Sequence, residues 1–283
     1  MRILIIGKNS YIGKNLKKWL EKYPEQYEVD SISVRNREWV KKDFSVYDVL
    51  INLAGVAHIN NITQDMKEHF YEINRDLAVE LGTKAKEERV KHFIQFSSMN
   101  VYGDYCDNVR DRENVNPTSF YGDSKLQGDI ALQRLADAEF CVALIRPPFV
   151  YGKECSGNYR LISKIANRIP VFVDYPNQKS MIYIDNLCEF IRLIIDDRLG
   201  GCFTPQNREL ISTTELVRMI ARQNNHTLYF TRFFNPVIKV GLKMTKIVRK
   251  GFADDYYSLQ LSDYYDFDYC VVNLEESIKR TEC

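Results

Sequence analysis

Two residues that could move protons stand four positions apart in the stretch 119–125, which reads SFYGDSK. On a helix this spacing brings Tyr121 and Lys125 onto one face, where the ammonium group can lower the pKa of the phenol. A free tyrosine keeps its proton until about pH 10, so a lysine neighbour would let Tyr121 act near neutral pH. The preceding NPTS at 116–119 is typical of a helix start, and apolar residues follow at helical spacing. We therefore predict an acid–base pair on a helix over residues 121–136.

The same tyrosine–lysine spacing occurs a second time, at Tyr175 and Lys179. Pro176 and Asn177 lie between them and favour a turn, so these two side chains need not share a helical face. Chance alone would produce about one such pair in a chain so rich in tyrosine and lysine. The spacing of Tyr121 and Lys125 alone therefore does not establish a catalytic pair, and neighbouring motifs must decide. An ordinary surface helix is the alternative.

Short apolar runs bounded by turn residues alternate with helical patterns along the first half of the chain. The runs cover residues 3–6, 27–34, 49–53, 92–96 and 142–145, and the helical patterns cover 13–23, 64–88 and 121–136. Such alternation is typical of an α/β fold with a parallel sheet between two layers of helices, whose ligands bind beyond the carboxyl ends of the strands. We expect a Rossmann-type doubly wound sheet over residues 1–152. Residues 153–283 are expected to form a smaller, discontinuous substrate-binding lobe, with some segments returning to the sheet.

A glycine-containing loop follows the first apolar run and leads into a helical pattern. It reads GKNSYIG over residues 7–13, where Gly7 would permit a tight turn and Gly13 a close contact between helix and strand. Backbone N–H groups at such a helix start can bind a pyrophosphate. Ser10 stands where the middle glycine of the motif is expected, so an ordinary strand–helix turn is the alternative.

Two arginines follow the second apolar run, at the place where NAD-binding sites usually carry an acidic residue for the ribose 2′-hydroxyl. A guanidinium can instead bind a 2′-phosphate, so Arg35 and Arg37 favour NADP over NAD. Solvated loop charges are the alternative. After the third run, residues 52–58 offer small side chains and backbone next to a ribose, and we assign no role to His58. The fourth run ends in FSSMNVYG, residues 96–103, which would deliver a hydroxyl to the sheet edge.

These motifs occur in the order seen in the extended short-chain dehydrogenase/reductases. The chain resembles their sugar-nucleotide epimerase/dehydratase/reductase branch, which includes UDP-glucose 4-epimerase. The motifs that carry the resemblance are the loop 7–13, the segment 52–55, Ser97-Ser98 before 101–103, Tyr121 with Lys125, and RPPFVYG at 146–152. The segments KSMIYIDNL at 179–187 and ISTTEL at 211–216 extend it over nearly the whole chain.

The resemblance implies a catalytic set. Tyr121 would be the general acid/base at the C4 oxygen of the sugar, Lys125 would lower its pKa and hold the nicotinamide ribose, and Ser98 would hydrogen-bond the same oxygen. Hydride would pass between C4 and the nicotinamide, so the cofactor would carry the redox chemistry. The implied cofactor contacts are Gly7, Ser10, Tyr11, Ile12, Gly13, Arg35, Arg37, Leu53, Ala54, Gly55, Tyr121, Lys125 and Pro148.

The resemblance also implies substrate contacts from Ser98, Asn100, Asn158 and Lys179. Lys179 stands where similar proteins tend to have an arginine for the nucleotide diphosphate, so it would bind phosphate without bidentate geometry. Asn158 resembles an asparagine of the substrate loop. Plain surface roles are the alternative for these last two residues.

Differences between this sequence and the motifs of the branch reduce the number of reactions expected. Dehydratases of the branch carry an Asp-Glu pair directly after the active-site hydroxyl, whereas this chain has Met99 and Asn100. An exchangeable phosphorylated cofactor, which Arg35 and Arg37 would suit, favours an NADP(H)-dependent reductase of a 4-keto nucleotide sugar in polysaccharide or glycan precursor synthesis. A nucleotide-sugar 4-epimerase with tightly held NAD is the alternative, and a non-catalytic NADP-binding protein is a distant one.

Composition limits the partners. The formal net charge of +1 gives no basis for nucleic-acid binding, and no apolar run approaches the roughly 18 residues that a membrane span needs. We expect a cytoplasmic enzyme that forms a homodimer, by resemblance, through helices that include the one carrying Tyr121. None of the four histidines lies at metal-ligand spacing, and the seven cysteines, an odd number, fit reduced thiols.

One late segment combines basic and apolar residues without any acid. Residues 232–250 contain Arg232, Lys239, Lys243, Lys246, Arg249 and Lys250 among large apolar side chains. A basic amphipathic helix can lie on an anionic membrane surface, so weak membrane contact is one interpretation. A helix with a solvated basic face over the lobe is the simpler one.

Overall fold

The computed structural model describes residues 1–56 and 64–283 and divides the chain into two compact units. The division expected at residue 152 lies between Pro147 and Pro148, and the chain crosses between the units more than once. The sheet unit comprises Met1–Asp104, Arg112–Pro147 and Cys188–Pro205. The second unit comprises Tyr105–Asp111, Pro148–Leu187 and Gln206–Cys283.

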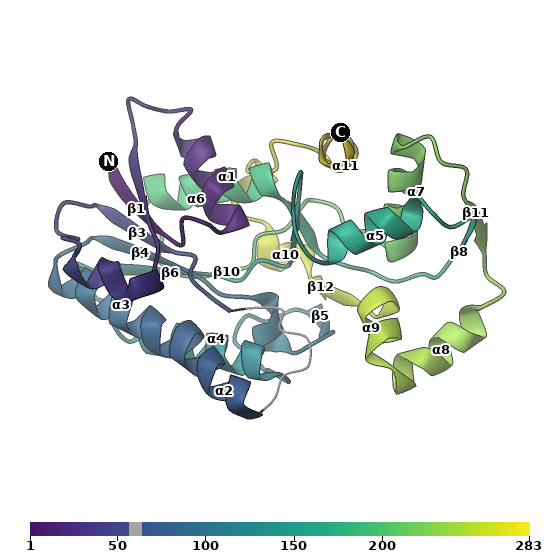
Figure 1. Ribbon diagram of the computed structural model, residues 1–283, viewed down its shortest axis with the longest axis horizontal. Helices are drawn as coiled ribbons and strands as arrows, with labels where there is room; N and C mark the ends of the chain where they lie inside the picture. The colour runs from purple at the N-terminus through teal and green to yellow at the C-terminus, as the bar shows by residue number, and fades with distance from the viewer. Residues whose placement is uncertain (57–63) are drawn as a thin grey trace. The chain divides into compact units, whose positions relative to one another are not determined.

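The sheet unit is built on a six-stranded sheet in which every pair of neighbours is parallel, as the apolar runs predict (Figure 1). Its spatial order is β10-β6-β4-β3-β1-β2, so the order reverses beside β1, where ligands of such sheets bind. The strands are β1 (Arg2–Ile6), β2 (Glu28–Ile32), β3 (Val49–Asn52), β4 (His92–Phe96), β6 (Cys141–Ile145) and β10 (Gly201–Phe203). Strand β10 was not expected, because a three-residue run that begins with a glycine carries no strand pattern.

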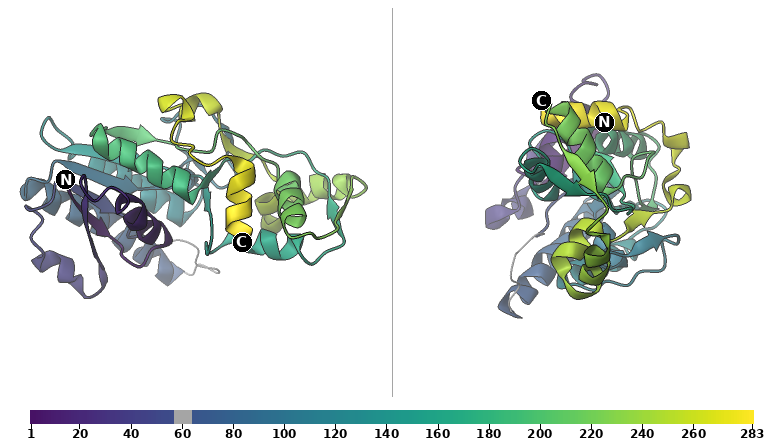
Figure 2. Two further views of the ribbon diagram at one scale, coloured as in Figure 1. Left: turned by 90° about the horizontal axis from the view of Figure 1, so that it is seen from above. Right: turned by 90° about the vertical axis from the view of Figure 1, so that its right-hand side faces the viewer.

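Helices cover both faces of this sheet (Figures 1 and 2). Side chains of a strand point alternately to its two faces, so Leu4 and Ile6 of β1 pack with Leu81 and Ala85 in one apolar cluster. On the other face, the Trp19 indole donates to Glu189 at 2.9 Å. The first face is covered by α2 (Gln64–Tyr71), α3 (Leu77–Glu87) and α4 (Phe120–Gln133), and the second by α1 (Tyr11–Leu20) and α6 (Ile184–Asp196).

The helical pattern over residues 64–88 forms three consecutive pieces, not one regular helix. Between α2 and α3, the backbone widens into a π-helical turn, η2 (Glu72–Asp76). Such a turn rotates the residues that follow, and it is often found at functional sites. Here it carries Asn74, whose side chain is fully buried.

The second unit contains three two-stranded parallel ribbons and several short helices. The ribbons pair β5 (Asp107–Val109) with β12 (Asp255–Tyr257), β7 (Phe149–Tyr151) with β9 (Met181–Tyr183), and β8 (Val171–Val173) with β11 (Tyr229–Thr231). The helices are α5 (Asn158–Ala166), α7 (Thr213–Gln223), α8 (Asn235–Met244), α9 (Lys246–Phe252), α10 (Leu259–Ser262) and α11 (Leu274–Glu282). The stretch 174–178 is not helical, which confirms that Tyr175 and Lys179 do not share a helical face.

The segment 232–250 does not form the single helix expected from its pattern. Thr245 has an extended backbone and ends α8, and its side chain accepts a hydrogen bond from the Val248 N–H at 3.3 Å to cap α9. Throughout the part of the chain that the structure describes, the helices fall short of the length and hydropathy needed to cross a membrane.

Candidate active site

Helix α4 carries the tyrosine and the lysine, and it begins where the sequence predicts. The Ser119 hydroxyl accepts a hydrogen bond from the Gly122 N–H at 3.3 Å, which satisfies one of the free N–H groups of the first turn. A Cβ atom at Gly122 would stand 2.3 Å from the Asn100 carbonyl oxygen. Glycine therefore lets the start of α4 lie directly against the segment that follows β4. This close approach positions Tyr121 next to the serine predicted as its partner.

That serine, Ser98, is buried, and its hydroxyl group both donates and accepts a hydrogen bond. Its Oγ donates to Asn100 Oδ1 at 2.9 Å and accepts from the Asn100 N–H at 3.2 Å. It also hydrogen-bonds the Tyr121 phenol. Asn100 is fixed in turn because its Nδ2 donates to Asp104 Oδ1 at 2.7 Å. The structure thus brings together three of the residues that the sequence nominates: Ser98, Asn100 and Tyr121.

The pKa of Tyr121 lies above its usual value, which differs from the expectation that Lys125 would lower it. Burial disfavours the phenolate and is the main cause; the hydrogen bond with Ser98 acts in the opposite direction, and the Asp129 charge raises the pKa further. The Lys125 ammonium donates to the Phe96 carbonyl at 3.0 Å. Burial lowers the pKa of Lys125 to about 8, while the Asp129 charge raises it.

Asp129 is a residue that sequence analysis did not single out. It follows Lys125 by four positions on the same face of α4, and it is fully buried. Its Oδ2 accepts from the Ser97 hydroxyl at 2.8 Å and from Arg146 Nε at 3.0 Å. Burial raises the pKa of Asp129, and the Arg146 guanidinium opposes that rise. The sequence signal was the spacing Tyr121, Lys125, Asp129, which places three ionisable groups along one helical face.

Arg146 reaches this cluster from the end of β6 and is itself buried. Its Nη1 donates to the Tyr102 phenol at 2.9 Å and to the Arg112 carbonyl at 3.1 Å. The RPPFVYG motif therefore contributes a charged side chain behind the tyrosine–lysine face. A buried ion pair of this kind orients its neighbours, because breaking it would leave an uncompensated charge in the interior.

The loop after β3 is tied to α4 by Asn74 of the π-helical turn. Asn74 Oδ1 accepts from the Val56 N–H at 3.0 Å, and its Nδ2 donates to the Val56 carbonyl and to Ser124 Oγ, both at 3.1 Å. A Cβ atom at Gly55 would stand 2.9 Å from Lys125 Nζ and 3.2 Å from Asn74 Oδ1. Glycine at this position therefore makes room for the ammonium group.

Sequence analysis also missed Asn74. An asparagine on the buried face of a predicted helix could have indicated a polar contact with a neighbouring element. The other predicted residues of this loop, Leu53 and Ala54, lie at the carboxyl end of β3. There, the Ala54 N–H donates to the buried Asn52 Oδ1 at 3.0 Å. His58 lies outside the described residues.

The loop of residues 7–13 has the features of an anion site. Gly7 adopts φ +106°, a conformation that other residues rarely take, and a Cβ atom there would stand 3.1 Å from the Leu53 carbonyl carbon. Ser10 caps α1 by accepting from the Gly13 N–H at 2.9 Å, so its hydroxyl stabilises the helix that begins with Tyr11 and Ile12. No acid lies in the first turn of α1. The residues present therefore fit a pyrophosphate at this helix start.

The two arginines after β2 differ in their surroundings. Arg37 pairs with Glu80 of α3 at 3.0 Å, and its guanidinium carbon lies 5.8 Å from the centroid of the Trp39 ring. Arg35 is exposed, and within residues 1–56 and 64–283 no acid lies at ion-pair distance from it. Since the Arg37 pair is itself exposed, it is worth at most about 1 kcal/mol and is open to competition by a phosphate.

Pro148, Asn158 and Lys179 belong to the second unit, and we place them within that unit alone. Pro148 is buried directly before β7, and Asn158 begins α5. The backbone of Lys179 pairs with Ile211, with N–H to carbonyl distances of 2.9 and 3.2 Å. Burial lowers the pKa of Lys179, and the carboxylates of Asp255 and Asp254 act in the opposite direction. A phosphate role for this lysine stays a prediction.

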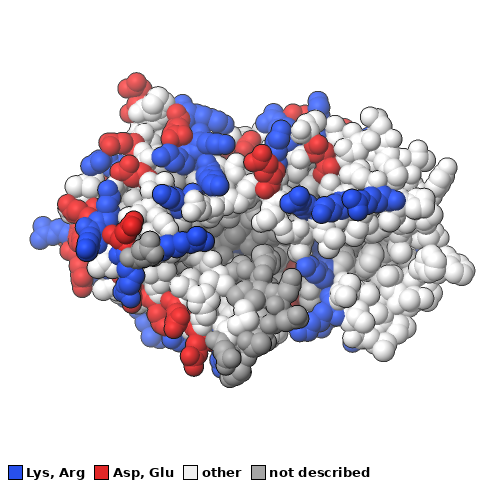
Figure 3. Space-filling view, viewed as in Figure 1, with Lys and Arg blue, Asp and Glu red and all other residues white. Residues whose placement is uncertain are grey.

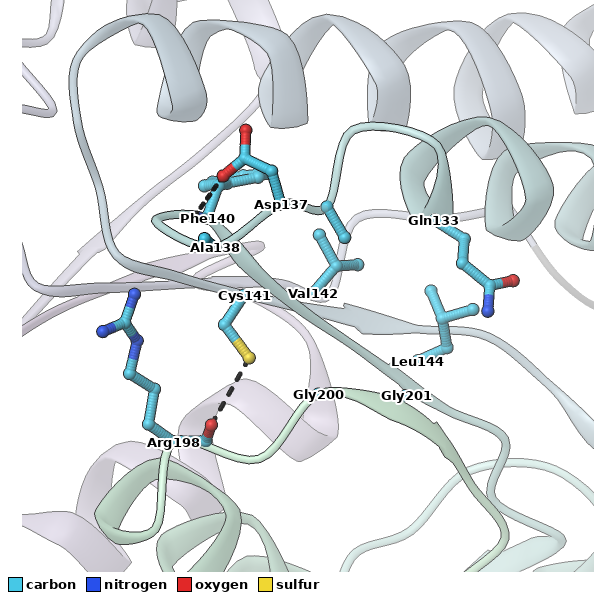
Figure 4. A pocket seen from close by; sticks show the side chains of 11 residues that line it. Gln133, Asp137, Ala138, Phe140, Cys141, Val142, Leu144, Arg198, Gly200 and Gly201 are labelled. Carbon is cyan, nitrogen blue, oxygen red and sulfur yellow. Dashed lines mark hydrogen bonds between the residues drawn. The ribbon is translucent and has the colours of Figure 1, made fainter.

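A pocket of about 480 Å³ lies elsewhere in the sheet unit (Figure 4). Its lining includes Cys141, whose Sγ donates to the Arg198 carbonyl at 3.4 Å, together with Gly200 and Gly201. These residues stand at the amino ends of β6 and β10, whereas Ser98, Tyr121 and the loop 7–13 follow the carboxyl ends of strands. This pocket is therefore not the candidate active site.

Comparison with known proteins agrees with this geometry. The family model described as the NAD dependent epimerase/dehydratase family matches residues 3–201. The UDP-glucose 4-epimerase of Vibrio cholerae is 29% identical over 249 residues, covering 77% of this chain and 74% of that protein. The N-acetyl-α-D-glucosaminyl-diphospho-ditrans,octacis-undecaprenol 4-epimerase of Escherichia coli O157:H7 is 27% identical over 218 residues, covering 70% and 64%. The match thus spans just under two thirds of that second relative.

Solved structures share the fold at low sequence identity. The UDP-glucuronic acid 4-epimerase from Bacillus cereus, in complex with NAD, superposes with a TM-score of 0.76 at 18% identity, covering 100% of this chain and 97% of that one. The dTDP-4-dehydrorhamnose reductase from Bacillus anthracis, in complex with NADP, superposes with a TM-score of 0.66 at 19% identity, covering 81% and 84%.

Proposed function

The chain belongs to the NAD-dependent epimerase/dehydratase family and is therefore an NAD(P)-dependent enzyme, and we propose that it transfers hydride at C4 of a sugar carried on a nucleoside diphosphate. The observation that carries this proposal is the cluster of Ser98, Tyr121 and Lys125 at the carboxyl ends of β3 and β4. The names of the relatives support the position on the sugar, since 4-epimerases and a 4-dehydro-sugar reductase all act at C4.

Tyr121 moves the proton in this proposal. As a ketone at C4 becomes an alcohol, Oη of Tyr121 donates its proton to the C4 oxygen; in the opposite direction it accepts that proton. The raised pKa keeps the phenol protonated at neutral pH, which suits the role of an acid. Ser98 would turn its O–H from Asn100 Oδ1 to the same sugar oxygen, while the Asn100 N–H continues to donate to Oγ and holds the serine in place. Asn100, which lies beside Ser98, is proposed to contact the substrate as well.

Lys125 holds the cofactor side of the site. Its ammonium lies beside Gly55, between the loop after β3 and the Phe96 carbonyl, where it would bind the hydroxyls of a nicotinamide ribose. The loop 7–13 would hold the pyrophosphate, with Leu53 and Ala54 beside it. When bound, the nicotinamide supplies or accepts the hydride at C4. Asp129 keeps Lys125 protonated through its charge, and acts as a positioning residue without touching substrate.

We propose NADP(H) as the cofactor and reduction of a 4-keto nucleotide sugar as the net reaction. The residues directly after β2 are Ser33, Val34 and Arg35, so the position that holds a ribose 2′-hydroxyl in NAD sites has no acid. Arg35 is exposed and ready for a 2′-phosphate. Asn158 and Lys179 of the second unit are proposed to contact the nucleotide-sugar.

A second candidate is 4-epimerisation with tightly held NAD. The 4-epimerases among the relatives favour it, as does the pairing of Arg37 with Glu80, which leaves one arginine fully available for a phosphate. Both candidates share the proton transfer by Tyr121 and differ in whether the cofactor leaves after each turnover.

The experiment that separates them identifies the nucleotide released from the purified protein on denaturation, by mass spectrometry, and titrates the protein with NADPH and NADH. Exchangeable binding that prefers NADPH supports the reductase, and turnover is then sought with 4-keto-6-deoxy nucleotide sugars. Stoichiometric NAD supports the epimerase, and UDP-hexoses are tried first. Absence of binding to either dinucleotide would refute the proposed function as a whole.

A further inference from the structure

Helix α8 leaves one of its apolar stripes uncovered. Val237, Val240 and Met244 follow one another at spacings of three and four residues, which places them along one side of the helix, and Phe233 lies in the turn directly before the helix begins. Phe233 is 82% exposed and Met244 is 76% exposed, and neither α8 nor α9 contains a fully buried residue. Isolated exposed apolar residues are ordinary, but a continuous stripe of large ones marks an interaction surface.

The other apolar side of α8 is already in use, so the stripe is not simply the inner face of the helix. A Cβ atom at Gly241 would stand 3.0 to 3.3 Å from atoms of the Val248 side chain, which shows how closely α9 packs there. Ile238 and Leu242 are half-buried on this side. Ile247 of α9, 85% exposed, lies outside this contact and adds to the uncovered apolar surface.

Basic side chains accompany the stripe on the same two helices. Lys239 and Lys243 stand one helical turn apart on α8, Lys246 and Lys250 follow on α9, and all four are exposed. For these four lysines, the structure gives no ion pair with any acid in residues 1–56 or 64–283. Long lysine side chains can lie along an apolar surface while their ammonium groups reach outward to anions.

The space-filling view shows the same combination. Where Figure 1 draws α8, the surface in Figure 3 is white, and basic side chains lie along its left edge. This charge pattern decides what the surface can meet. A second copy of the chain, docked through the same face, would bring two basic clusters together without acids between them. A layer of anionic headgroups over hydrocarbon matches both the charges and the apolar stripe.

We propose that α8 and α9 bind the surface of a membrane that contains anionic lipids, with the Phe233 to Met244 stripe entering the headgroup region and the lysines contacting lipid phosphates. The binding does not depend on the reaction at the sheet unit. It would hold the enzyme at the membrane surface. The proposal therefore stands or falls separately from the proposed function.

The test is co-sedimentation of the full-length protein with vesicles of phosphatidylcholine containing about one third phosphatidylserine, against vesicles of phosphatidylcholine alone. We expect binding to the anionic vesicles that weakens at high ionic strength, because exposed charges are screened by salt. Each lysine near such a surface strengthens binding by about five-fold, so replacing Lys239, Lys243 and Lys246 by glutamine should weaken it by about 100-fold.

A matched control removes the same charge elsewhere. Lys18, Lys91 and Lys164 are exposed and lie outside α8 and α9, so their triple replacement by glutamine should leave vesicle binding unchanged. A separate variant that carries Phe233→Ser, Met244→Ser and Ile247→Ser should lose at least about ten-fold in binding, because each apolar side chain contributes by leaving water. All these positions are exposed, so circular dichroism should show folded protein in every case.

Three outcomes would overturn the proposal. The first is absence of sedimentation with the anionic vesicles at low ionic strength. The second is equal binding by the two lysine variants, which would show a general charge effect with no role for this surface. The third is a wild-type dimer that dissociates when the serine substitutions are made, with neither protein binding vesicles; it would assign the stripe to contact between copies of the chain.

Discussion

The buried charge of Asp129 should set the pH range in which the candidate site works. Its carboxylate raises the pKa of both Tyr121 and Lys125, since a negative charge disfavours the phenolate and favours the ammonium. Replacing Asp129 by asparagine removes this charge while keeping an acceptor for Ser97 and Arg146. Both pKa values should then fall. In the pH dependence of kcat/KM, the rising part and the falling part should therefore both persist and both move to lower pH.

The size of this movement follows from the geometry of α4. Lys125 is four residues from Asp129, so the Cβ atoms are about 6 Å apart, and at an effective dielectric constant of about 20 two unit charges at that distance interact by about 3 kcal/mol, or about two pH units. Tyr121 is eight residues from Asp129, which is about 12 Å along the helix, so its interaction is about half as large and corresponds to about one pH unit. Because Arg146 remains and its own charge partly offsets that of Asp129, we expect the pKa of Lys125 to move by about one to two pH units and that of Tyr121 by up to about one.

Two assays measure the effect. The pH dependence of kcat/KM reports the essential groups of the free enzyme. Tyrosinate absorbance, taken as the difference from the matching Tyr121→Phe protein, follows Tyr121 without any substrate. Ser97→Ala is the control. It removes a neutral hydrogen-bond partner of Asp129, so the rising and falling parts of the pH profile should stay at their wild-type pH.

Stability must be followed alongside, because Asp129→Asn leaves the Arg146 guanidinium buried without its counter-ion. We expect the free energy of unfolding to fall by roughly 3 kcal/mol, which thermal unfolding will show. Asp129→Glu keeps the charge and should keep the pH profile. An unchanged profile and an unchanged tyrosinate titration in a folded Asp129→Asn protein would refute the reasoning, because they would show that Asp129 carries no charge felt by Tyr121.

Three further predictions concern single positions. Tyr121→Phe should lower kcat by about 100-fold or more while dinucleotide affinity, measured by fluorescence, stays the same, because Ser98 keeps its bonds with Asn100 and only the proton donor is lost; turnover at the wild-type rate would exclude this tyrosine as the acid. Gly55→Ala should weaken dinucleotide binding in the same titration, because the added methyl group would displace the Lys125 ammonium, and unchanged affinity would contradict the role given to Lys125. Arg35→Ala should weaken NADPH binding by about ten-fold or more and leave NADH binding unchanged, since one charge-assisted contact to a phosphate is lost; equal losses for both cofactors would reject the NADP assignment.

Local patterns were sufficient for much of this protein. Apolar runs and the helical patterns between them predicted five strands of the parallel sheet and the start of α4 at Ser119, because these features depend on residues close together in the chain. The order of the motifs likewise predicted the family. In the same way, Pro176 and Asn177 favoured a turn between Tyr175 and Lys179, and the structure has no helix there.

The charge pairs and pKa values of the site could be determined only from the tertiary structure. Asp129 meets Arg146 from another element, Arg37 meets Glu80 across 43 positions, and Asn74 reaches Ser124 across 50. No local pattern specifies such pairs, because they arise only when helices and strands pack. The pKa of Tyr121 shows the consequence: spacing alone predicts that Lys125 lowers it, whereas burial by the surrounding elements raises it. Desolvation depends on every neighbour in space, so the sequence determined which groups could do the chemistry and the folded structure decided their protonation.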